Sequence, residues 1–329
     1  MIDQRSFIDR RSFGAAALAM LAQPQSVRAQ QPQHVPRVGV IVSGSSTHPF
    51  MGYFRRGLLA LGYADGTNIQ IVVRYTDGRA DAAKEVAAEI VGMPVDVIVA
   101  HFTPSVGAAK ALTKTIPIIM APAGAPVEVG LVESLAKPGG NVTGVSAMDA
   151  EVGGKRLQLL REIVPNLNRV AVLASTTDPF ATPFLRELAR MGQVSGIEIL
   201  PIMASGPADF PEGFVAMERG GAQAVMIQGL FSPHRTVLID LANRHRLPLL
   251  AQDRETTEAG GLISYGVDYA VLIERCATFV DKILKGTKPA DLPVEQATRF
   301  ELVVNAKVAK TFGFAVPPSI LLLANNVVE

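Results

Sequence analysis

The sequence predicts an α/β protein built from two similar doubly wound parallel-sheet lobes that are joined by a three-segment hinge. Short apolar runs alternate with amphipathic segments along the chain, which is the pattern of parallel strands covered by helices. The second half repeats the order of the first. The 329 residues, of which 48% are hydrophobic, are enough for two cores.

Ten strands are predicted, in two series of five. The first series is 38–42, 69–74, 95–100, 116–120 and 142–146. The second series is 170–174, 198–203, 224–228, 247–251 and 262–265. A long helix is expected over residues 269–285.

One helix face recurs 130 positions later in the chain. The residues shared by the two copies are Pro49, Phe50, Phe54, Leu58, Leu61 and Gly62, which recur as Pro179, Phe180, Phe184, Leu188, Met191 and Gly192. Any two helices of a wound sheet can share such a face, but here strand, helix, glycine and later strand agree in order. Each half is therefore expected to form its own lobe.

The predicted first lobe covers residues 35–146 plus about 267–299. The second lobe, with a tail that crosses the hinge, covers residues 147–266 plus about 300–329. Crossings between the lobes are expected at 146–154, 266–268 and 300–305. The carboxyl ends of the strands should line a cleft there, where α/β sheets bind ligands.

The first 29 residues are predicted to be an export signal peptide. Arg10 and Arg11 precede an apolar stretch over residues 13–22, and Val27-Arg28-Ala29 ends the segment with small residues. The Arg-Arg-Ser-Phe run favours the twin-arginine route, with ordinary secretion as the alternative and an amphipathic amino-terminal helix as the other interpretation. The expected location is the periplasm.

Composition excludes several classes of protein. The 31 basic residues balance 30 acidic ones, and no basic stripe is present, so no nucleic-acid partner is expected. The single cysteine, Cys276, cannot form an internal disulfide and is expected in the core. No metal-binding cluster, dinucleotide motif or nucleophile elbow is present, so no catalytic residue, metal or cofactor is predicted.

In the first lobe, small polar residues that follow predicted strands are the candidate ligand contacts. Hydroxyl groups at a helix start cap backbone N–H groups, and the same groups attract a carboxylate. Phe102 is a candidate to flank an apolar or aromatic ligand. The first-lobe candidates are Ser45, Ser46, Phe102, Thr103, Ser105, Pro122 and Ser146.

The second lobe supplies further candidates after its own strands. Asp253, just past a strand, is the better candidate to meet an amine or hydroxyl of the ligand, whereas Asp178 is mainly a helix-cap candidate. Tyr265, at the end of a strand near a crossing, is expected to cover the ligand. The second-lobe candidates are Asp178, Phe180, Gln228, Asp253 and Tyr265.

Several stretches resemble the family of ABC-transporter substrate-binding proteins related to the tryptophan-binding component. They are PGGNVTGVS at 138–146, GGLISYG at 260–266, KILKG at 282–286, DLPVEQ at 291–296 and FELVVN at 300–305. The resemblance spans residues 35–329. It departs from the family at Ala125-Pro126, where an Asp-Pro pair is common, and this puts direct transfer of an amino-acid specificity in doubt.

The resemblance implies a type I periplasmic-binding fold and a monomer that closes on a small ligand. It also implies docking to an ABC permease with its ATPase subunits. From the hydroxyl-rich helix starts we expect a small carboxylate-bearing ligand that is amino-acid-like or aromatic. The alternatives are a periplasmic sensor that feeds a receptor, the effector core of a repressor, and a cleft enzyme with His101 and Asp253 as an acid/base pair. The export signal and the absence of a DNA-binding headpiece argue against the repressor.

Overall fold

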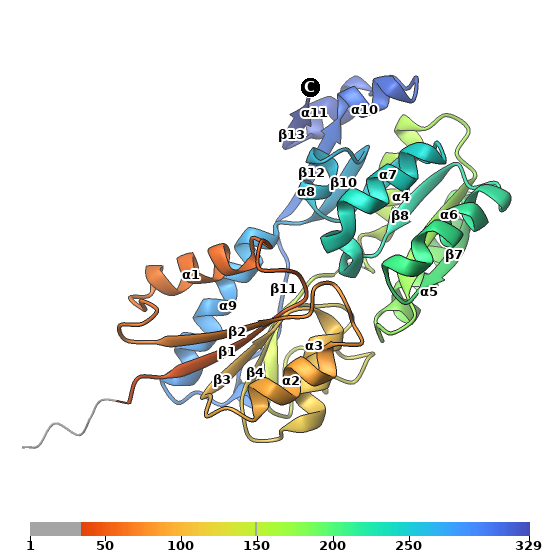
Figure 1. Ribbon diagram of the computed structural model, residues 1–329. Helices are drawn as coiled ribbons and strands as arrows, with labels where there is room; N and C mark the ends of the chain where they lie inside the picture. The colour runs from red at the N-terminus through yellow and green to blue at the C-terminus, as the bar shows by residue number, and fades with distance from the viewer. Residues whose placement is uncertain (1–33, 149) are drawn as a thin grey trace, which may run out of the picture. The chain divides into compact units, whose positions relative to one another are not determined.

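Two sheets with helices on both faces organise the residues that the structure describes, 34–148 and 150–329, in this computed structural model (Figure 1). The first sheet has six strands in the order β11-β5-β4-β3-β1-β2, and every pair is parallel. Its strands are β1 (Arg37–Val42), β2 (Gln70–Tyr75), β3 (Val97–Ala100), β4 (Ile118–Ala123), β5 (Val142–Ser146) and β11 (Glu295–Gln296).

The second sheet has seven strands in the order β13-β12-β10-β9-β8-β6-β7. All its pairs are parallel except β10 with β12, which is antiparallel. Its strands are β6 (Arg169–Ser175), β7 (Glu198–Ala204), β8 (Ala224–Ile227), β9 (Leu249–Ala251), β10 (Ile263–Val267), β12 (Phe300–Asn305) and β13 (Asn326–Val328).

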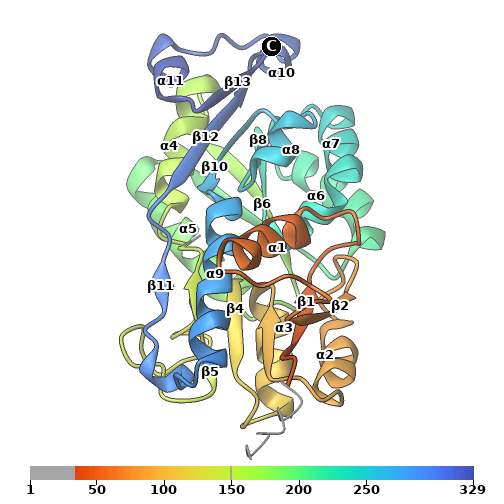
Figure 2. The ribbon, with the colours of Figure 1, turned by 90° about the vertical axis from the view of Figure 1, so that its left-hand side faces the viewer.

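Helices cover both faces of each sheet. The first sheet is packed by α1 (Phe50–Ala60), α2 (Ala83–Val91), α3 (Phe102–Leu112) and α9 (Tyr269–Leu284), with α1 lying against α9 (Figure 2). The second lobe contains α4 (Gly153–Ile163), α5 (Ala181–Ser195), α6 (Phe210–Arg219), α7 (Arg235–Arg244), α8 (Arg254–Glu258), α10 (Ala306–Thr311) and α11 (Pro318–Leu323). Short 3-10 turns are η1 (Pro207–Asp209), η2 (Gly229–His234) and η3 (Pro289–Asp291).

Strand side chains alternate between two cores in each lobe. In β1, Val40 packs with α1 and α9, whereas Ile41 packs on the opposite face with α2 and α3. In β6, Val172 and Leu173 divide in the same way between the two faces of the second sheet. Because side chains in a strand alternate faces, a sheet covered on both sides needs such continuous apolar runs. The repeat seen in the sequence is therefore a repeat of this layered unit.

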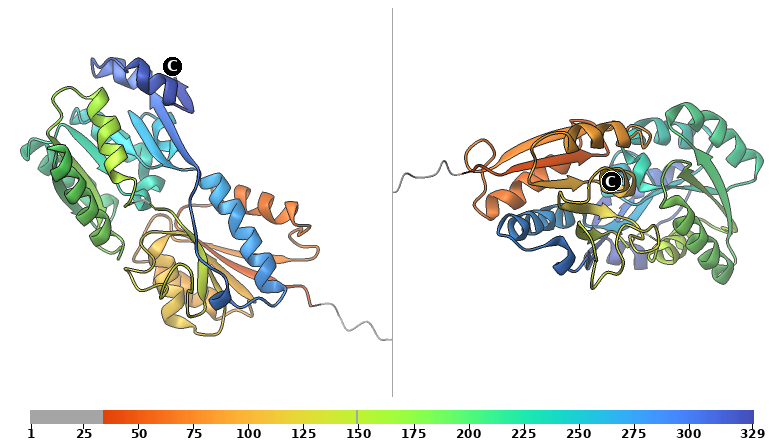
Figure 3. Two further views of the ribbon diagram at one scale, coloured as in Figure 1. Left: turned by 180° about the vertical axis from the view of Figure 1, so that it is seen from behind. Right: turned by 90° about the horizontal axis from the view of Figure 1, so that it is seen from below.

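The chain passes between the two sheets three times. It leaves the first sheet after β5 and enters the second lobe at α4, and it returns after β10 into α9. The third passage runs from β11 to β12 (Figure 3).

The predicted fold class is confirmed, and all ten predicted strands are present with small shifts at their ends. Three features differ from expectation. Residues 300–305, predicted only as a crossing, form strand β12 and pair with β10, and neither β11 nor β13 was predicted. With two and three residues, β11 and β13 are too short for a clear strand signal.

The predicted export signal, residues 1–29, lies outside the described residues. Among residues 34–148 and 150–329, no helix combines the length and the apolar character needed to cross a bilayer. The longest of the described helices, α9, carries charged side chains such as Glu274, Arg275 and Asp281.

Two glycines of α1 provide a matched test of this packing. A Cβ on Gly57 would lie 2.6 Å from the backbone oxygen of Glu274 in α9, whereas a Cβ on Gly52 would have no atom within 4 Å. We expect Gly57→Ala to lower the free energy of unfolding by about 1–3 kcal/mol because α9 must shift. Gly52→Ala should raise it by roughly 0.5–1 kcal/mol through helix propensity.

Chemical denaturation of the two variants and the parent measures both changes. Equal effects of the two substitutions would contradict the close approach of α1 and α9.

Candidate ligand-binding site

A buried cavity lies where strands of both sheets end. We call it the Asp178 cavity; it has about 270 Å³ of empty space, including the part open to solvent. Each residue that lines it follows the carboxyl end of a strand, which is where α/β sheets bind ligands. The lining residues are Phe102 and Thr103 after β3, Gly124 after β4, Ala147 after β5, Asp178 and Phe180 after β6, Gln228, Gly229 and Leu230 after β8, and Gln252 after β9.

The Asp178 carboxyl group is the only acidic group that lines this cavity among the described residues. Its Oδ1 accepts a hydrogen bond from the Phe180 N–H at 3.0 Å, and its Oδ2 accepts one from Gln228 Nε2 at 2.6 Å. Gln228 is held in turn, because its Oε1 accepts from the Ser175 N–H at 2.8 Å. Burial raises the pKa of Asp178 from 3.8 to about 6, against the opposing effect of these two hydrogen bonds.

The Gln252 amide lies in the same cavity with an unused donor. Its Nε2 is inaccessible to water and has no hydrogen-bond partner among the described residues. A buried donor without a partner costs about 1–3 kcal/mol, so such groups are rare unless something else binds them. The arrangement can therefore hold a group that accepts hydrogen bonds.

The start of α3 adds further donors beside Gln252. Its first turn has no side-chain cap, so its backbone N–H groups are not used by a capping residue. Thr103 Oγ1 accepts from the Gly124 N–H at 3.1 Å, which ties the start of α3 to the loop after β4. Phe102 has a backbone φ of +64°, a left-handed value that is uncommon for a bulky residue.

The two lobes touch beside this cavity through a position without a side chain. A Cβ on Gly124 of the first lobe would lie 2.5 Å from the Phe180 ring of the second lobe. Nearby, Arg186 of α5 donates to both oxygens of Glu128, at 2.7 and 2.6 Å. A side chain at position 124 would therefore require the Phe180 ring to shift.

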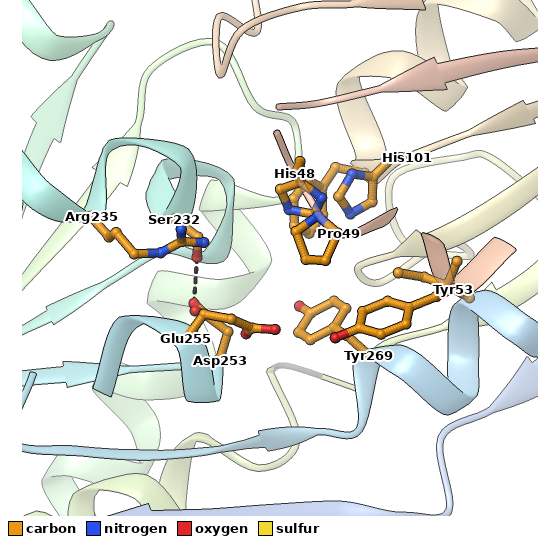
Figure 4. Close-up of a pocket in the computed structure, with 11 residues that line it drawn as sticks. His48, Pro49, Tyr53, His101, Ser232, Arg235, Asp253, Glu255 and Tyr269 are labelled. Carbon is orange, nitrogen blue, oxygen red and sulfur yellow. Dashed lines mark hydrogen bonds between the residues drawn. The ribbon is translucent and has the colours of Figure 1, made fainter. Parts of the chain in front are cut away.

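A second cavity, the Tyr53 cavity, has about 400 Å³ of empty space, including the part open to solvent, and shares Phe102 with the first (Figure 4). The first lobe contributes mostly rings, and the second lobe contributes polar and charged groups. The lining residues are His48, Pro49, Tyr53, His101, Phe102, Tyr269 and Ile273 from the first lobe, and Ser232, Arg235, Asp253 and Glu255 from the second.

Two neutral imidazoles lie at one side of the Tyr53 cavity. Burial lowers the pKa of His48 to about 4, and Arg235 adds to the effect. His48 Nδ1 accepts from the Phe50 N–H at 3.2 Å, so its proton is on Nε2. His101 is 1% exposed, stacks on Phe102 with ring centroids 4.0 Å apart, and has a pKa well below its usual value because of burial.

Asp253 lines the Tyr53 cavity, but its carboxylate is already used within the second lobe. Oδ2 accepts from Ser232 Oγ at 2.5 Å, and Oδ1 accepts from both the N–H and the Oγ1 of Thr256 at 2.8 Å. Asp253 thus caps α8 and lines the cavity wall, and the expectation that it meets a ligand amine or hydroxyl stays a prediction.

Five of the twelve predicted residues line the Asp178 cavity: Phe102, Thr103, Asp178, Phe180 and Gln228. Six others line neither cavity: Ser45, Ser46, Ser105, Pro122, Ser146 and Tyr265. Pro122, Ser146 and Tyr265 lie within strands and Ser105 lies within α3. The direction of a side chain and its local partners are not visible in a sequence pattern.

The serine loop after β1 neither caps α1 nor lines the two cavities. Ser45 Oγ bonds with Thr47 Oγ1 at 2.8 Å, Ser46 is exposed, and the α1 N-cap is Pro49. Ser105 is fully buried and bonds with Ser43 Oγ at 3.1 Å.

The remaining three predicted residues that line neither cavity lie within strands of the two sheets. Pro122 and Ser146 are buried in β4 and β5. Tyr265 packs on Phe300 with ring centroids 5.9 Å apart, and its backbone oxygen accepts from Arg156 Nε at 2.6 Å. Tyr265 is thus part of the strand packing and does not cover the cavities.

Several polar lining residues were not among the predicted contacts, and five of them are Tyr53, Arg235, Gln252, Glu255 and Tyr269. Gln252 directly follows β9 and could have been chosen by the same rule as Asp253. The other four lie within helices, where the sequence alone does not show which face meets the cavity.

The acid/base pair raised as an alternative, His101 with Asp253, is not formed among the described residues. No hydrogen bond joins His101 to Asp253, and both oxygens of Asp253 are used elsewhere. In the same part of the chain, no group of three or more His, Cys, Asp or Glu side chains is placed to hold a metal ion.

Comparison with known proteins decides the family. Residues 37–328 match the family model described as ABC transporter substrate binding protein. The chain belongs to this family. A curated relative, the tyrosine-binding protein of Clostridioides difficile (strain R20291), is 27% identical over 268 residues, which cover 80% of this chain and 77% of the relative.

Solved structures agree with the fold. A conserved domain protein from Vibrio cholerae is 28% identical, with a TM-score of 0.83 over 89% of this chain and 100% of its own. An ABC domain from Streptococcus pneumonia in complex with L-Trp is 24% identical, with the same TM-score over 90% of this chain and 100% of its own. The fold is that of the type I periplasmic-binding proteins.

The unused donor of Gln252 makes a testable prediction about stability. Gln252→Leu should leave unchanged or raise the free energy of unfolding of the ligand-free protein, by up to about 1 kcal/mol, because a buried amide whose N–H donor has no acceptor is removed. Gln223→Leu is the matched control. Its Oε1 accepts from the N–H groups of Asn168 and Arg169, so its loss should destabilise by about 1–2 kcal/mol.

Urea denaturation of the three proteins checks this. A clear loss of stability in Gln252→Leu would mean that the amide is satisfied within the protein.

Proposed function

We propose that the chain is the periplasmic solute-binding component of an ABC importer and captures an amino-acid-like, carboxylate-bearing aromatic ligand between its lobes. The observation that carries this proposal is the pairing of a buried carboxyl group, Asp178, with an unpartnered amide donor, Gln252 Nε2, in one cavity. An amino acid presents the complementary charges. Its ammonium group would bind Asp178, and its carboxylate would bind Gln252 and the start of α3.

The neighbouring Tyr53 cavity supports an aromatic side chain. It adjoins the Asp178 cavity at Phe102 and is lined by the rings of Tyr53, Phe102 and Tyr269. A ligand with its head group at Asp178 would extend past Phe102 into these rings. The relative that is named for binding tyrosine, 27% identical over most of both chains, is consistent with this class of ligand.

Capture would work by closure of the two lobes. The ligand contacts residues of both lobes, such as Thr103 and Asp178, and so favours the conformation in which the lobes are together. The three passages between the sheets are short segments that suit a hinge. The closed monomer would then dock on a permease with ATPase subunits, after export by the twin-arginine or the ordinary route.

The same geometry supports binding without turnover. Asp178 is held by Gln228 and the Phe180 backbone, and His101 has no carboxylate partner to act with. We therefore propose that the protein is not an enzyme. A periplasmic sensor would use an identical site, and neighbouring permease genes would distinguish import from sensing.

A thermal-shift screen of the purified protein tests the ligand class. Amino acids, aromatic acids, nucleobases and sugars are each added in excess. An amino acid at 100 times its dissociation constant should stabilise the protein by about 2.7 kcal/mol. A sugar that stabilises while no carboxylate does would contradict the proposal, and chemical conversion of the bound ligand would contradict a purely binding role.

The raised pKa of Asp178 predicts weaker binding in acid. Below about pH 6 the carboxyl group takes up a proton, and an ammonium ion then loses its partner. The dissociation constant of the ligand should therefore rise by roughly tenfold between pH 7 and pH 5. Asp178→Asn should bind weakly at both values with little change between them. Calorimetric titration of both proteins at the two pH values measures the dissociation constants. A pH dependence that persists in Asp178→Asn would show that Asp178 is not the group responsible for it.

The ligand-free protein should show the opposite trend for this group. Because its pKa is raised, Asp178 contributes stability at low pH that is lost as the pH rises toward 6. The pKa of His48 is lowered, so its contribution to the free energy of unfolding is lost as the pH falls over the same range. The difference in free energy of unfolding between the parent and Asp178→Asn isolates the contribution of Asp178.

A further inference from the structure

The second-lobe wall of the Tyr53 cavity carries two charges of opposite sign that are not paired. Within the described part of the chain, neither Arg235 nor Glu255 forms an ion pair, and Glu255 has a hydrogen bond only with its own backbone. The adjacent Arg254, in contrast, forms ion pairs with Glu258 and Glu301. Arg235 and Glu255 therefore line the cavity with part of their hydrogen-bonding capacity unused.

Both groups are partly removed from water. Arg235 Nε is inaccessible to solvent and has no partner among the described residues. Burial raises the pKa of Glu255 and the charge of Asp253 adds to this effect, whereas its backbone hydrogen bond and the charge of Arg235 act against it. Charges in such a place cost free energy unless a partner binds them, so both would gain from a ligand that supplies the missing hydrogen bonds.

The first-lobe wall of the Tyr53 cavity limits the shape of a ligand that can reach Arg235 and Glu255. Glu255 points toward the rings of Tyr53 and Tyr269 across the cavity (Figure 4). His101, with both ring nitrogens unpartnered, and Phe102 close another side. A flat ring that stacked among these surfaces would have its edge toward the two charges.

We infer that Arg235 and Glu255 form a specificity subsite for a ligand ring that bears a group able both to donate and to accept a hydrogen bond, such as a phenolic hydroxyl. The inference rests on the proposed function, because it concerns the far end of the ligand held at Asp178. Such a group donates to the Glu255 carboxylate and accepts from the Arg235 guanidinium. A plain ring leaves both charges desolvated without a partner, which is how sites reject analogues that lack a polar group.

The test uses two amino acids that differ by one hydroxyl group. Calorimetric titration of the purified protein with L-tyrosine and L-phenylalanine should show at least about tenfold tighter binding of tyrosine. Glu255→Leu and Arg235→Leu should each bring the two affinities to within about threefold, mainly by weakening tyrosine. Glu255→Gln and Arg235→Lys, which keep hydrogen-bonding groups, should retain part of the preference.

Exposed residues of α6 provide matched controls. Glu212→Leu and Arg219→Leu remove the same side chains outside both cavities and should leave the tyrosine preference unchanged. Thermal unfolding without ligand verifies that each variant is folded.

The outcomes separate the two proposals. Equal affinity of the parent protein for tyrosine and phenylalanine overturns the subsite and leaves the proposed function standing. A preference for tyrosine that survives in both leucine variants also overturns the subsite. Failure of every amino acid to bind overturns the proposed function and the subsite with it.

Discussion

The cost of burying a polar atom without a partner is the constraint on which this site depends. Most buried polar groups of a folded chain are satisfied by hydrogen bonds, and those that are not need another explanation. Here the ring nitrogens of His101, Nε of Arg235 and Nε2 of Gln252 are both inaccessible and unpartnered. All three residues line two adjoining cavities at the strand ends. These three residues therefore place unused hydrogen-bonding groups at adjoining cavities, where a small ligand can supply the partners, whereas the unpartnered Thr257 Oγ1 lies outside both.

The architecture explains why these groups can gather. Each sheet is covered on both faces by apolar layers, so polar residues are left to the loops at strand ends. Two such sets of loops meet beside Gly124, which lets the Phe180 ring of the other lobe approach its backbone. The strands give rigid positions to the loops, and the three passages between the lobes allow the two sets to separate and return. The apolar layers on the two faces of each sheet therefore stabilise the fold, and the loops at the strand ends bind the ligand.

The layers could be predicted from sequence because they follow simple periodicities. Runs such as residues 38–42 and 170–174 are apolar at every position, which specifies strands buried on both faces. The site was predicted in part. Asp178 and Gln228 were found because they follow strands directly. Asp253 also follows a strand, but its oxygens are used by Ser232 and Thr256, a long-range and a local contact that a strand pattern does not encode. Arg235 and Glu255 lie within the first turns of α7 and α8, whose orientation depends on tertiary packing.

A crystal structure of the protein with its tightest-binding amino acid is the most direct measurement. We expect the ligand carboxylate within hydrogen-bond distance of Gln252 Nε2 and the ammonium group beside Asp178, with the side chain past Phe102 among the rings. Two results would contradict the claim that the ligand satisfies the unpartnered atoms. One is a ligand bound away from these two residues, and the other is a hydrogen bond from Gln252 Nε2 to another protein group in the complex.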